Sequence, residues 1–503
     1  MILKEAAKLI KTAVLRGDGE TAFSGIQMHT AKLAPGDLFV CVPAIPGQLT
    51  DRHAYAGKAW EAGASALVVE RELDVPLPQL VVKDARYAMA VIAAAFYRHP
   101  SRELKLIALT GTNGKTTTSY IIEAILGHAG YRTGLMGNIA TKIGDTEWET
   151  DINTQEPPAL QANLRRMADA GVQYCVMEAT SQGLATGRVV GCSFRTAVFT
   201  NLTQDHLDFH GTMEDYRAAK GLLFSRLGNA ELGGDDERRY AVLNADDEAS
   251  AYMKRQTAAE VLTYGIRNPA DVQASDMQLT PRGTRFRLTS FAGEAELTTK
   301  LVGAFNVENV LAAVTACLAE NIPLSVIRDG LAAMPPVRGR MEVIDEGQDF
   351  LVLVDYAHTP DGLESALSSI RGFAEGRIIT LFGCGGDRDR SKRPMMGRTA
   401  AAYSDCIVLT SDNPRLEDPE AILDGIEEGI RDAGWAEDRV ERIADRREAI
   451  ARAIRLAQPG DVVYLAGKGH ETYQLIEGRK LELDDREEAQ KVLRTLVQGG
   501  NSR

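Results

Sequence analysis

Apolar runs of strand length alternate with helix-like segments along most of this chain, and the alternation limits the folds it can adopt. Strand-like runs include "LKLIALT", "QYCVMEAT", "RTAVFTNL" and "RYAVLNADD" before residue 337, and "DFLVLVDY", "GRIITLFGC", "SDCIVLTS" and "GDVVYLAG" after it. Such alternation predicts an α/β fold of open, mainly parallel sheets with helices on both faces. Between about Leu262 and Leu301, shorter alternating runs such as "GTRFRLTSF" predict an antiparallel hairpin region.

Two proline-containing breaks divide the chain. The first is His99-Pro100-Ser101, and the second is "MPPVRGRME" at Met334–Glu342, where consecutive prolines cannot continue a helix. A length of 503 residues also favours about three domains, at roughly 150 residues each. We therefore expect a small N-terminal α/β domain at 1–100, a central P-loop-type domain at 101–336 and a Rossmann-like α/β domain at 337–503.

Composition excludes several classes of function. No apolar run approaches the ~18 residues of a membrane span. The residues before Gly17 are predicted to form an amphipathic helix without signal-peptide features, so we expect a cytoplasmic protein without membrane insertion. A net charge of −13 argues against nucleic acid as a partner. The six cysteines are scattered without a C-x-x-C pair, and we assign them no chemistry.

A glycine-rich loop after "LKLIALT" is the strongest chemical signal. The apolar run leads into Gly111–Thr116, and a helix-like segment follows directly. Such a loop turns backbone N–H groups towards one point, to which the helix N-terminus adds its dipole. Lys115 suits the terminal phosphates of ATP, and the Thr116 hydroxyl suits Mg²⁺. Leu109 stands where G-x-x-x-x-G-K-[ST] has its first glycine.

Two further residues are candidates for the metal of an ATP site. Glu178 ends the apolar run "QYCVMEAT", and His206 follows the next run in "TNLTQDHLDFHG". The carboxyl end of a parallel sheet is where both side chains can face the phosphates. From the residues alone, Glu178 is equally a strand-end surface acid and His206 a hydrogen-bonded loop histidine.

Ten short motifs, in order along the chain, carry a family resemblance. They are "TGTNGKTTT", "TNLTQDHLDFHG", "YRAAK", "GAFNVENVLAA", "VRGRME", "VDYAHTPD", "GCGGDRDRSKRP", "SDNPR", "AGKGHE" and "LDDRE". With them the chain resembles the Mur ligase family, the ATP-dependent amide-forming enzymes of peptidoglycan precursor synthesis. The resemblance covers nearly the whole chain, and it is greatest to the members that add the third peptide residue.

The resemblance implies carboxylate activation with ATP and Mg²⁺ as cofactors. ATP would phosphorylate the D-glutamyl γ-carboxylate of UDP-N-acetylmuramoyl-L-Ala-D-Glu, and the amine of meso-diaminopimelate would attack the resulting acyl phosphate. Because two anions must meet, neutralisation of charge and alignment would supply most of the catalysis.

The resemblance also assigns roles to individual residues. The catalytic set would be Lys115, Glu178, His206 and a carbamylated Lys220. The metal would be held by Thr116, Glu178, His206 and Lys220. ATP would contact Gly111, Thr112, Asn113, Gly114, Lys115, Thr116, Thr117, Asn306, Arg340, Asp355 and His358, with Asn309 near the adenine side. Without the resemblance, Lys220 is predicted to be a lysine on the solvated face of a helix.

The acceptor side departs from the family pattern at three motifs. The family's D-S-R, N-T-T-P and S-S-H are here His29-Thr30-Ala31, Asn153–Pro157 and Thr180-Ser181-Gln182. Hydroxyl and amide groups remain to bind a muramoyl-peptide, and Arg188 remains for an acidic group. The resemblance assigns acceptor binding to Met28, Thr30, Asn153, Thr154, Gln155, Thr180, Thr186 and Arg188. A diverged member that acts on another acidic acceptor is the alternative.

The loop "TSDNPRLEDP" raises the question of the added amino acid. It follows the strand-like "DCIVLT", and Asp418 and Pro419 suit the start of the helix "PEAILDGIEEGI". A turn accounts for the other loop residues but gives Arg415 no task. A guanidinium can grip the distal carboxylate that distinguishes diaminopimelate from lysine. We assign amino-acid binding to Arg388, Asp412, Asn413, Pro414, Arg415, Gly467 and Glu471.

Competing functions remain at this stage. Within the superfamily they are a lysine-adding ligase and a folylpolyglutamate synthase, and the "DNPR" loop argues against the latter. From other classes come a P-loop ATPase that makes no bond and a binding regulator with an inactive nucleotide site. Phosphate release that requires an acidic acceptor and an amino acid together would distinguish a ligase from the ATPase and from the regulator.

Overall fold

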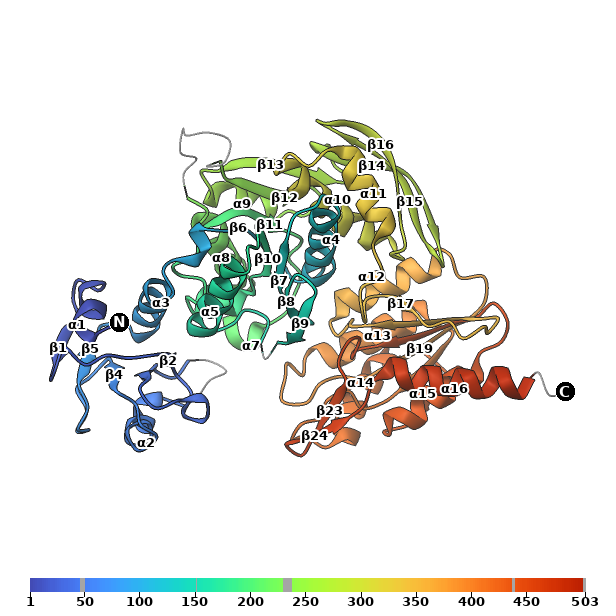
Figure 1. Ribbon diagram of the computed structural model, residues 1–503. Helices are drawn as coiled ribbons and strands as arrows, with labels where there is room; N and C mark the ends of the chain where they lie inside the picture. Colours follow the sequence, from blue (N-terminus) through green and yellow to red (C-terminus); the bar gives the residue numbers. More distant parts are fainter. Residues whose placement is uncertain (46–49, 151, 229–237, 437–438, 501–503) are drawn as a thin grey trace.

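The computed structural model describes residues 1–45, 50–150, 152–228, 238–436 and 439–500, arranged around three separate sheets (Figure 1). The strands of these sheets lie at 14–81, 105–299 and 342–466. The α/β class predicted from the alternation is confirmed, and so is the arrangement in three domains predicted from the two breaks and the length. Within the described ranges, no helix is both long and apolar enough to cross a membrane.

The N-terminal sheet has five short strands in the order β1-β5-β4-β3-β2. Its strands are β1 (Val14–Arg16), β2 (Ile26–Gln27), β3 (Leu38–Val40), β4 (Ala66–Val69) and β5 (Gln79–Val81). The helices are α1 (Leu3–Lys8), α2 (Ala56–Glu61) and α3 (Ala85–Phe96), with 3₁₀ turns η1 (Thr30–Lys32), η2 (Arg52–Tyr55) and η3 (Pro100–Arg102).

The helix predicted before Gly17 is wrong beyond Lys8. There α1 ends, and Val14–Arg16 forms β1, which runs antiparallel to β5. Pairing with β5 gives the backbone of both strands hydrogen-bond partners, and this tertiary gain outweighs the helical spacing of the local sequence.

The central sheet has eleven strands in the order β16-β15-β14-β13-β12-β11-β6-β10-β7-β8-β9. Its strands are β6 (Lys105–Thr110), β7 (Thr133–Met136), β8 (Ala140–Ile143), β9 (Thr146–Glu149), β10 (Tyr174–Glu178), β11 (Phe194–Phe199), β12 (Tyr240–Asn244), β13 (Glu260–Gly265), β14 (Val272–Thr280), β15 (Gly283–Ser290) and β16 (Gly293–Thr299). Strands from β14 to β7 are parallel, whereas β14-β15-β16 and β7-β8-β9 are antiparallel. The predicted hairpin region is therefore confirmed, and it forms one end of the sheet (Figure 1).

Helices cover both faces of the central sheet because successive side chains of a strand point to opposite sides. Along β6, Ile107 and Leu109 belong to a core shared with α4 and α10, while Leu106 and Ala108 belong to a core shared with α5 and α8. The helices are α4 (Lys115–His128), α5 (Pro157–Asp169), α6 (Ser181–Ala185), α7 (Leu207–His210), α8 (Met213–Ser225), α9 (Ser250–Gln256), α10 (Ala304–Ala319) and α11 (Leu324–Ala333).

The C-terminal sheet has six strands in the order β17-β18-β22-β19-β20-β21, all parallel except β17. They are β17 (Glu342–Val343), β18 (Leu351–Asp355), β19 (Ile378–Phe382), β20 (Cys406–Leu409), β21 (Val440–Arg442) and β22 (Val462–Ala466), and a separate hairpin joins β23 (Tyr473–Ile476) to β24 (Arg479–Glu482). The helices are α12 (Pro360–Arg371), α13 (Lys392–Tyr403), α14 (Pro419–Asp432), α15 (Arg446–Leu456) and α16 (Asp485–Gly500). As predicted, Asp418 caps α14, accepting a hydrogen bond from the Glu420 N–H.

A buried ion pair ties α16 to the carboxyl ends of the C-terminal strands. Arg446 and Asp485 are fully buried, with Nε–Oδ1 and Nη2–Oδ2 distances of 2.8 and 2.6 Å. Arg446 Nη2 also donates to the Ala466 carbonyl oxygen at the end of β22. The pair therefore fixes the strand ends from which substrate-binding loops are expected to start.

We expect Arg446→Ala to lower the free energy of unfolding of the C-terminal domain by about 3–5 kcal/mol, because it leaves the Asp485 carboxylate buried without its partner. Arg452→Ala is the matched control: it breaks the exposed bidentate pair with Glu441 and should cost at most ~1 kcal/mol. Urea denaturation of both variants measures the difference. Equal losses would contradict a special role for the buried pair.

Candidate functional site

The glycine-rich loop lies between β6 and α4, as predicted. Gly114 is the N-cap of α4 with a φ of +85°, and an added Cβ would come within 2.2 Å of Asn309 Oδ1. An added Cβ at Gly111 would lie 1.8 Å from Thr200 Oγ1. Both positions therefore require glycine, and the loop is held tightly against its neighbours.

Two lysines converge on this loop. Lys115 Nζ donates to the carbonyl oxygens of Gly111 and Thr112, at 2.8 and 2.7 Å. Lys220 Nζ, from α8, donates to the same Gly111 oxygen at 2.7 Å. Burial lowers the pKa of both ammonium groups, well below the usual range for Lys220, whose pKa is lowered further by the charge of Lys115. From its helix position alone, Lys220 is predicted to lie on a solvated face. The structure instead buries it, with 1% of the residue exposed.

A carboxylate faces the start of α4. Glu178, at the end of β10, accepts hydrogen bonds through Oε1 from Thr116 Oγ1 and the Asn138 N–H, at 2.8 and 3.0 Å. Its other oxygen, Oε2, is buried and has no hydrogen-bond partner among the described residues. Arg340, from the C-terminal side of the second linker, donates through Nη2 to Thr116 Oγ1 at 3.0 Å.

The donor set fits Mg²⁺. A buried carboxylate oxygen without a partner beside a hydroxyl is the hard oxygen chemistry that this ion prefers. In the described chain, no three His, Cys, Asp or Glu side chains gather around one point. The residues alone would therefore form only part of the coordination, which suits an ion that is usually shared between one or two carboxylates, substrate phosphates and water.

His206 lies on the same cavity at the start of α7. Its φ is +54°, and its Nε2 is 3.4 Å from Asp205 Oδ2. Burial lowers the pKa of His206, while the Asp205 carboxylate opposes that shift. The neutral imidazole that burial favours can serve as a ligand or as a hydrogen-bond acceptor.

These side chains line one cavity of about 190 Å³ between the central and C-terminal domains. The predicted residues that it brings together are Gly111, Thr112, Asn113, Gly114, Lys115, Thr116, Thr117, Asn153, Glu178, Thr180, His206, Lys220, Arg340 and His358. Asp361, in the first turn of α12, accepts hydrogen bonds from Asn113 and Thr203, at 2.7 and 3.2 Å, and so joins the two domains.

Sequence reasoning missed five lining residues: Asn138, Ser181, Asp205, Tyr216 and Tyr356. Ser181, Asp205, Tyr216 and Tyr356 stand inside quoted motifs, so their positions beside assigned residues were the available signal. Asn138 follows β7 and carries no such signal.

Two other predicted ATP contacts, Asn306 and Asp355, form hydrogen bonds with residues outside the cavity lining. Asn306 is buried, donates to the Val302 carbonyl oxygen and accepts from Asn309 Nδ2. The Asp355 carboxyl accepts from the Tyr464 hydroxyl and the Met341 N–H, and burial raises its pKa. Neither residue lines the cavity itself.

The predicted acceptor residues are largely occupied by contacts within the protein. Arg188 Nη1 donates to the Thr154 carbonyl oxygen at 2.9 Å, and Arg188 Nε lies 3.0 Å from Glu156 Oε1. Gln155 bonds Thr141 and Asn163. Thr186 caps its own helix by donating to the Gln182 carbonyl oxygen.

The N-terminal domain contributes the remaining predicted acceptor residues. Met28 is buried in that domain's core, and Thr30 begins η1. Arg52 donates to the Met28 carbonyl oxygen at 2.8 Å. Burial lowers the pKa of Arg52, and the Glu156 carboxylate on the central domain opposes that shift, so the two charges attract across the domain junction.

The predicted amino-acid-binding residues come together at the ends of β19, β20 and β22. Asn413 Nδ2 donates to Glu471 Oε2 at 2.9 Å, and the buried Lys468, which the sequence did not single out, donates to the same oxygen. Asp412 Oδ2 is buried without a partner in the described ranges, and a Cβ on Gly467 would approach it to 2.6 Å.

Arg415 has structural contacts that the sequence did not reveal. Its φ is +56°, and its backbone exchanges hydrogen bonds with Leu475 and Glu477 beside β23. Its Nη1 donates to the Gly386 carbonyl oxygen at 2.7 Å. Partial desolvation lowers the pKa of Arg388, and the Arg415 charge adds to this effect, so two cations lie close together at this edge.

A phosphate loop and a second α/β domain that face each other across one charged cavity define a nucleotide-using enzyme. Residues 109–317 match the Mur ligase middle domain, and residues 339–469 match the Mur ligase, glutamate ligase domain. A relative from Geobacillus thermodenitrificans, named UDP-N-acetylmuramoyl-L-alanyl-D-glutamate–2,6-diaminopimelate ligase, is 50% identical over 93% of this chain and 94% of its own.

Solved structures agree with these matches. A structure titled UDP-N-acetylmuramoyl-L-alanyl-D-glutamate–2,6-diaminopimelate ligase is 33% identical, covers 99% of both chains and gives a TM-score of 0.67. The fold is also that of the MurF ligase from Thermotoga maritima in complex with ADP, at 17% identity over 95% of this chain and 98% of that one, and a TM-score of 0.64. This chain belongs to the Mur ligase family, and it is an ATP-dependent, amide-forming ligase.

We expect Lys115→Ala and Glu178→Ala each to lower turnover by a factor of order 10²–10⁴, because each removes a charge that stabilises the transferring phosphoryl group or its metal. Lys254→Ala, on the surface of α9 in the same domain, is the control. ADP release measures all three. Near-normal turnover in Lys115→Ala would contradict the phosphate-loop assignment.

Proposed function

We propose that this ligase adds meso-diaminopimelate to the γ-carboxylate of the D-glutamyl residue in UDP-N-acetylmuramoyl-L-Ala-D-Glu, with ATP and Mg²⁺, in the cytoplasm. The product is a peptidoglycan precursor. The observation that carries the proposal is the pair of guanidinium groups, Arg388 and Arg415, at the C-terminal strand ends. A second carboxylate on the amino-acid substrate would give these two like charges a shared counter-ion.

The first chemical step forms the acyl phosphate. The γ-carboxylate oxygen attacks the terminal phosphorus of ATP, and ADP leaves. Lys115 and the N–H groups of the loop offset the charge of the phosphates, while the N-terminus of α4 adds its dipole. Bound Mg²⁺, held through Glu178 and the Thr116 hydroxyl, would neutralise further phosphate charge.

The second step forms the amide. The amine of the incoming amino acid attacks the acyl carbon, and phosphate leaves from the tetrahedral intermediate. Glu471, Asn413 and Lys468 form a hydrogen-bonded group beside the Arg415 loop, which suits an amino acid's own ammonium and carboxylate. The Arg340 and Asp361 contacts hold the two domains together around the reacting groups.

Lys220 is proposed to act as a carbamate. A neutral amine is the form that attacks CO₂, giving a carbamate anion and a proton, and burial favours that neutral form. The carbamate would place an anion in the cavity that Glu178 also lines, close to the charge of Lys115. This change of sign would remove the repulsion between Lys220 and Lys115.

A second candidate is a member that uses another acidic acceptor. The observation in its favour is Glu156, whose carboxylate lies 3.0 Å from Arg188, the residue assigned to an acidic group of the acceptor. A family member that keeps this guanidinium occupied would bind an acceptor with different charge at that point.

We expect Lys220→Ala to be nearly inactive, because the chain then lacks the proposed anion. Formate should restore part of the rate by supplying a carboxylate in its place. The measurement is ADP release across formate and bicarbonate concentrations, with Lys254→Ala as control. Wild-type rates in Lys220→Ala, independent of bicarbonate, would leave the lysine as a structural residue.

The proposed substrates are tested with ATP, Mg²⁺ and UDP-N-acetylmuramoyl-L-Ala-D-Glu against a panel of amino acids, with the products identified by mass. We expect discrimination for meso-diaminopimelate over lysine of ~10⁴, since lysine leaves the cationic pair without its carboxylate. Arg415→Ala should lose most of this activity but retain ADP binding, and Arg415→Lys should lose part of it because lysine cannot bind bidentately.

Three outcomes would be decisive here. Equal use of lysine and diaminopimelate, or an unchanged rate in Arg415→Ala, would contradict the assignment of the loop. Product with no amino acid of the panel would contradict this acceptor and favour the second candidate.

A further inference from the structure

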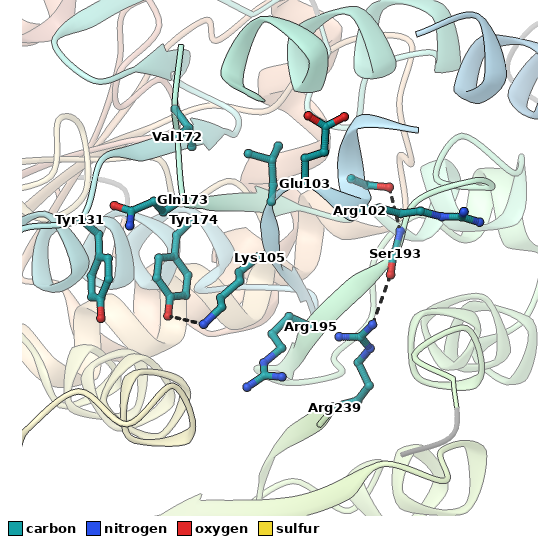
Figure 2. A pocket seen from close by; sticks show the side chains of 12 residues that line it. Arg102, Glu103, Lys105, Tyr131, Val172, Gln173, Tyr174, Ser193, Arg195 and Arg239 are labelled. Carbon is teal, nitrogen blue, oxygen red and sulfur yellow. Dashed lines mark hydrogen bonds between the residues drawn. The ribbon is translucent and has the colours of Figure 1, made fainter. Parts of the chain in front are cut away.

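Within the described ranges two lysines are buried, and one of them lies outside the nucleotide site. Lys220 is 1% exposed and donates to the phosphate loop, whereas Lys468, in the loop after β22, is 0% exposed. Lys105, at the other end of β6 from the phosphate loop, is a contrast: it is half-buried at an open cavity, where its Nζ donates to the Tyr174 hydroxyl at 3.5 Å (Figure 2). The full enclosure of Lys468 needs a local reason, because burial penalises its charge.

The loop that carries Lys468 is packed on both sides. A Cβ on Gly467 would come within 2.6 Å of Asp412 Oδ2, in the predicted amino-acid-binding loop. A Cβ on Gly469 would come within 2.6 Å of the Gly339 carbonyl oxygen, in the second linker. The backbone around Lys468 is therefore fixed between these two segments, and its side chain starts from a defined position.

The ammonium group of Lys468 bonds two residues assigned to the amino acid. Lys468 Nζ donates to Glu471 Oε2 at 2.9 Å and to Asn413 Oδ1 at 3.3 Å. Asn413 Nδ2 donates to the same Glu471 oxygen at 2.9 Å, and Asn413 Oδ1 also accepts the Leu475 N–H at 2.8 Å. Together these bonds orient the Asn413 amide and hold the Glu471 carboxylate by one of its oxygens.

The other oxygen of Glu471 is held less closely. Burial raises the pKa of Tyr356, and the Glu471 charge adds to this effect, so the Tyr356 hydroxyl stays protonated and can donate. It donates to Glu471 Oε1 at 3.4 Å, which is longer than the about 2.5–3.0 Å usual for such bonds. Because a carboxylate oxygen has two lone pairs, Oε1 can accept a second, closer donor. The Glu471 side chain is 15% exposed, so a ligand can reach it, whereas Lys468 is enclosed.

We infer that Lys468 is a positioning residue for the added amino acid: it holds Glu471 by Oε2 and leaves Oε1 for an ammonium group of that substrate. The inference rests on the proposed function, in which Glu471 belongs to the amino-acid site. Lys468 acts through Glu471 and Asn413, since no part of its own side chain is exposed to a ligand. A lysine that only tied its loop together would affect stability without a particular effect on the amino acid.

The test is steady-state ADP release by the full-length Lys468→Met chain, with meso-diaminopimelate varied at saturating ATP, Mg²⁺ and acceptor. Methionine keeps the length of the side chain but removes its charge and donors. We expect the KM for diaminopimelate to rise by about tenfold or more, the scale of losing a hydrogen bond to a charged group, while the KM for ATP stays nearly unchanged. Lys142→Met is the matched control, because it breaks the 3.2 Å pair with Glu123 in the central domain and should change neither KM.

A double-substitution cycle shows whether Lys468 acts through Glu471. If it does, adding Lys468→Met to Glu471→Gln should raise the KM for diaminopimelate little further, because the carboxylate that Lys468 positions has already been replaced. Additive effects would contradict the inference, and so would an unchanged KM for diaminopimelate in Lys468→Met. Circular dichroism checks that each variant is folded, and Lys468→Gln, which keeps a polar group there, replaces Lys468→Met in the cycle if that variant does not fold.

Failure of the proposed function would give a different result. If the wild-type chain adds another amino acid, the titrations use that amino acid, and a non-additive cycle still supports the role of Lys468. An active wild-type chain with an unaffected Lys468→Met variant contradicts this inference alone. If the wild-type chain gives no product with any amino acid, the proposed function is contradicted, and the inference is overturned with it.

Discussion

The carbonyl oxygen of Gly111 accepts hydrogen bonds from two buried lysines, and much of the site depends on this arrangement. Lys115 and Lys220 reach it from different helices, at 2.8 and 2.7 Å. Two ammonium groups this close and this buried repel each other, and burial penalises both charges. The arrangement is therefore suited to a state in which anions arrive, such as phosphates near Lys115 and the carbamate proposed for Lys220.

Hydrogen bonds between the central and C-terminal domains hold the phosphate loop in place. Arg340 donates to Thr116, and Asp361 accepts from Asn113 and Thr203, so the phosphate loop is bonded to two elements of the C-terminal domain. These bonds link residues more than 150 positions apart along the chain. The nucleotide site therefore belongs to both domains, and movement between them would open or complete it.

The proposed amino-acid end and acceptor end of the site differ in whether their charged groups already have partners of opposite charge within the protein. At the amino-acid end, Arg388 and Arg415 lie close together with like charge, a situation that a dicarboxylic amino acid would relieve. At the acceptor end, Arg188 already has the Glu156 carboxylate and the Thr154 carbonyl oxygen as partners. An acceptor that binds Arg188, as proposed, would have to compete with this internal ion pair.

Sequence alone determined the α/β class, the hairpin region, the strand–loop–helix of the phosphate site and the cap of α14, because each depends on local spacing. It failed between Lys8 and Gly17, where pairing of β1 with β5 replaced the continuation of the predicted helix. Only the tertiary structure decided that Lys220 is buried against Gly111, that Asn306 and Asp355 do not line the cavity, and that Arg188 is paired with Glu156. These outcomes depend on which distant residues meet, and burial and charge act only once the chain has folded them together.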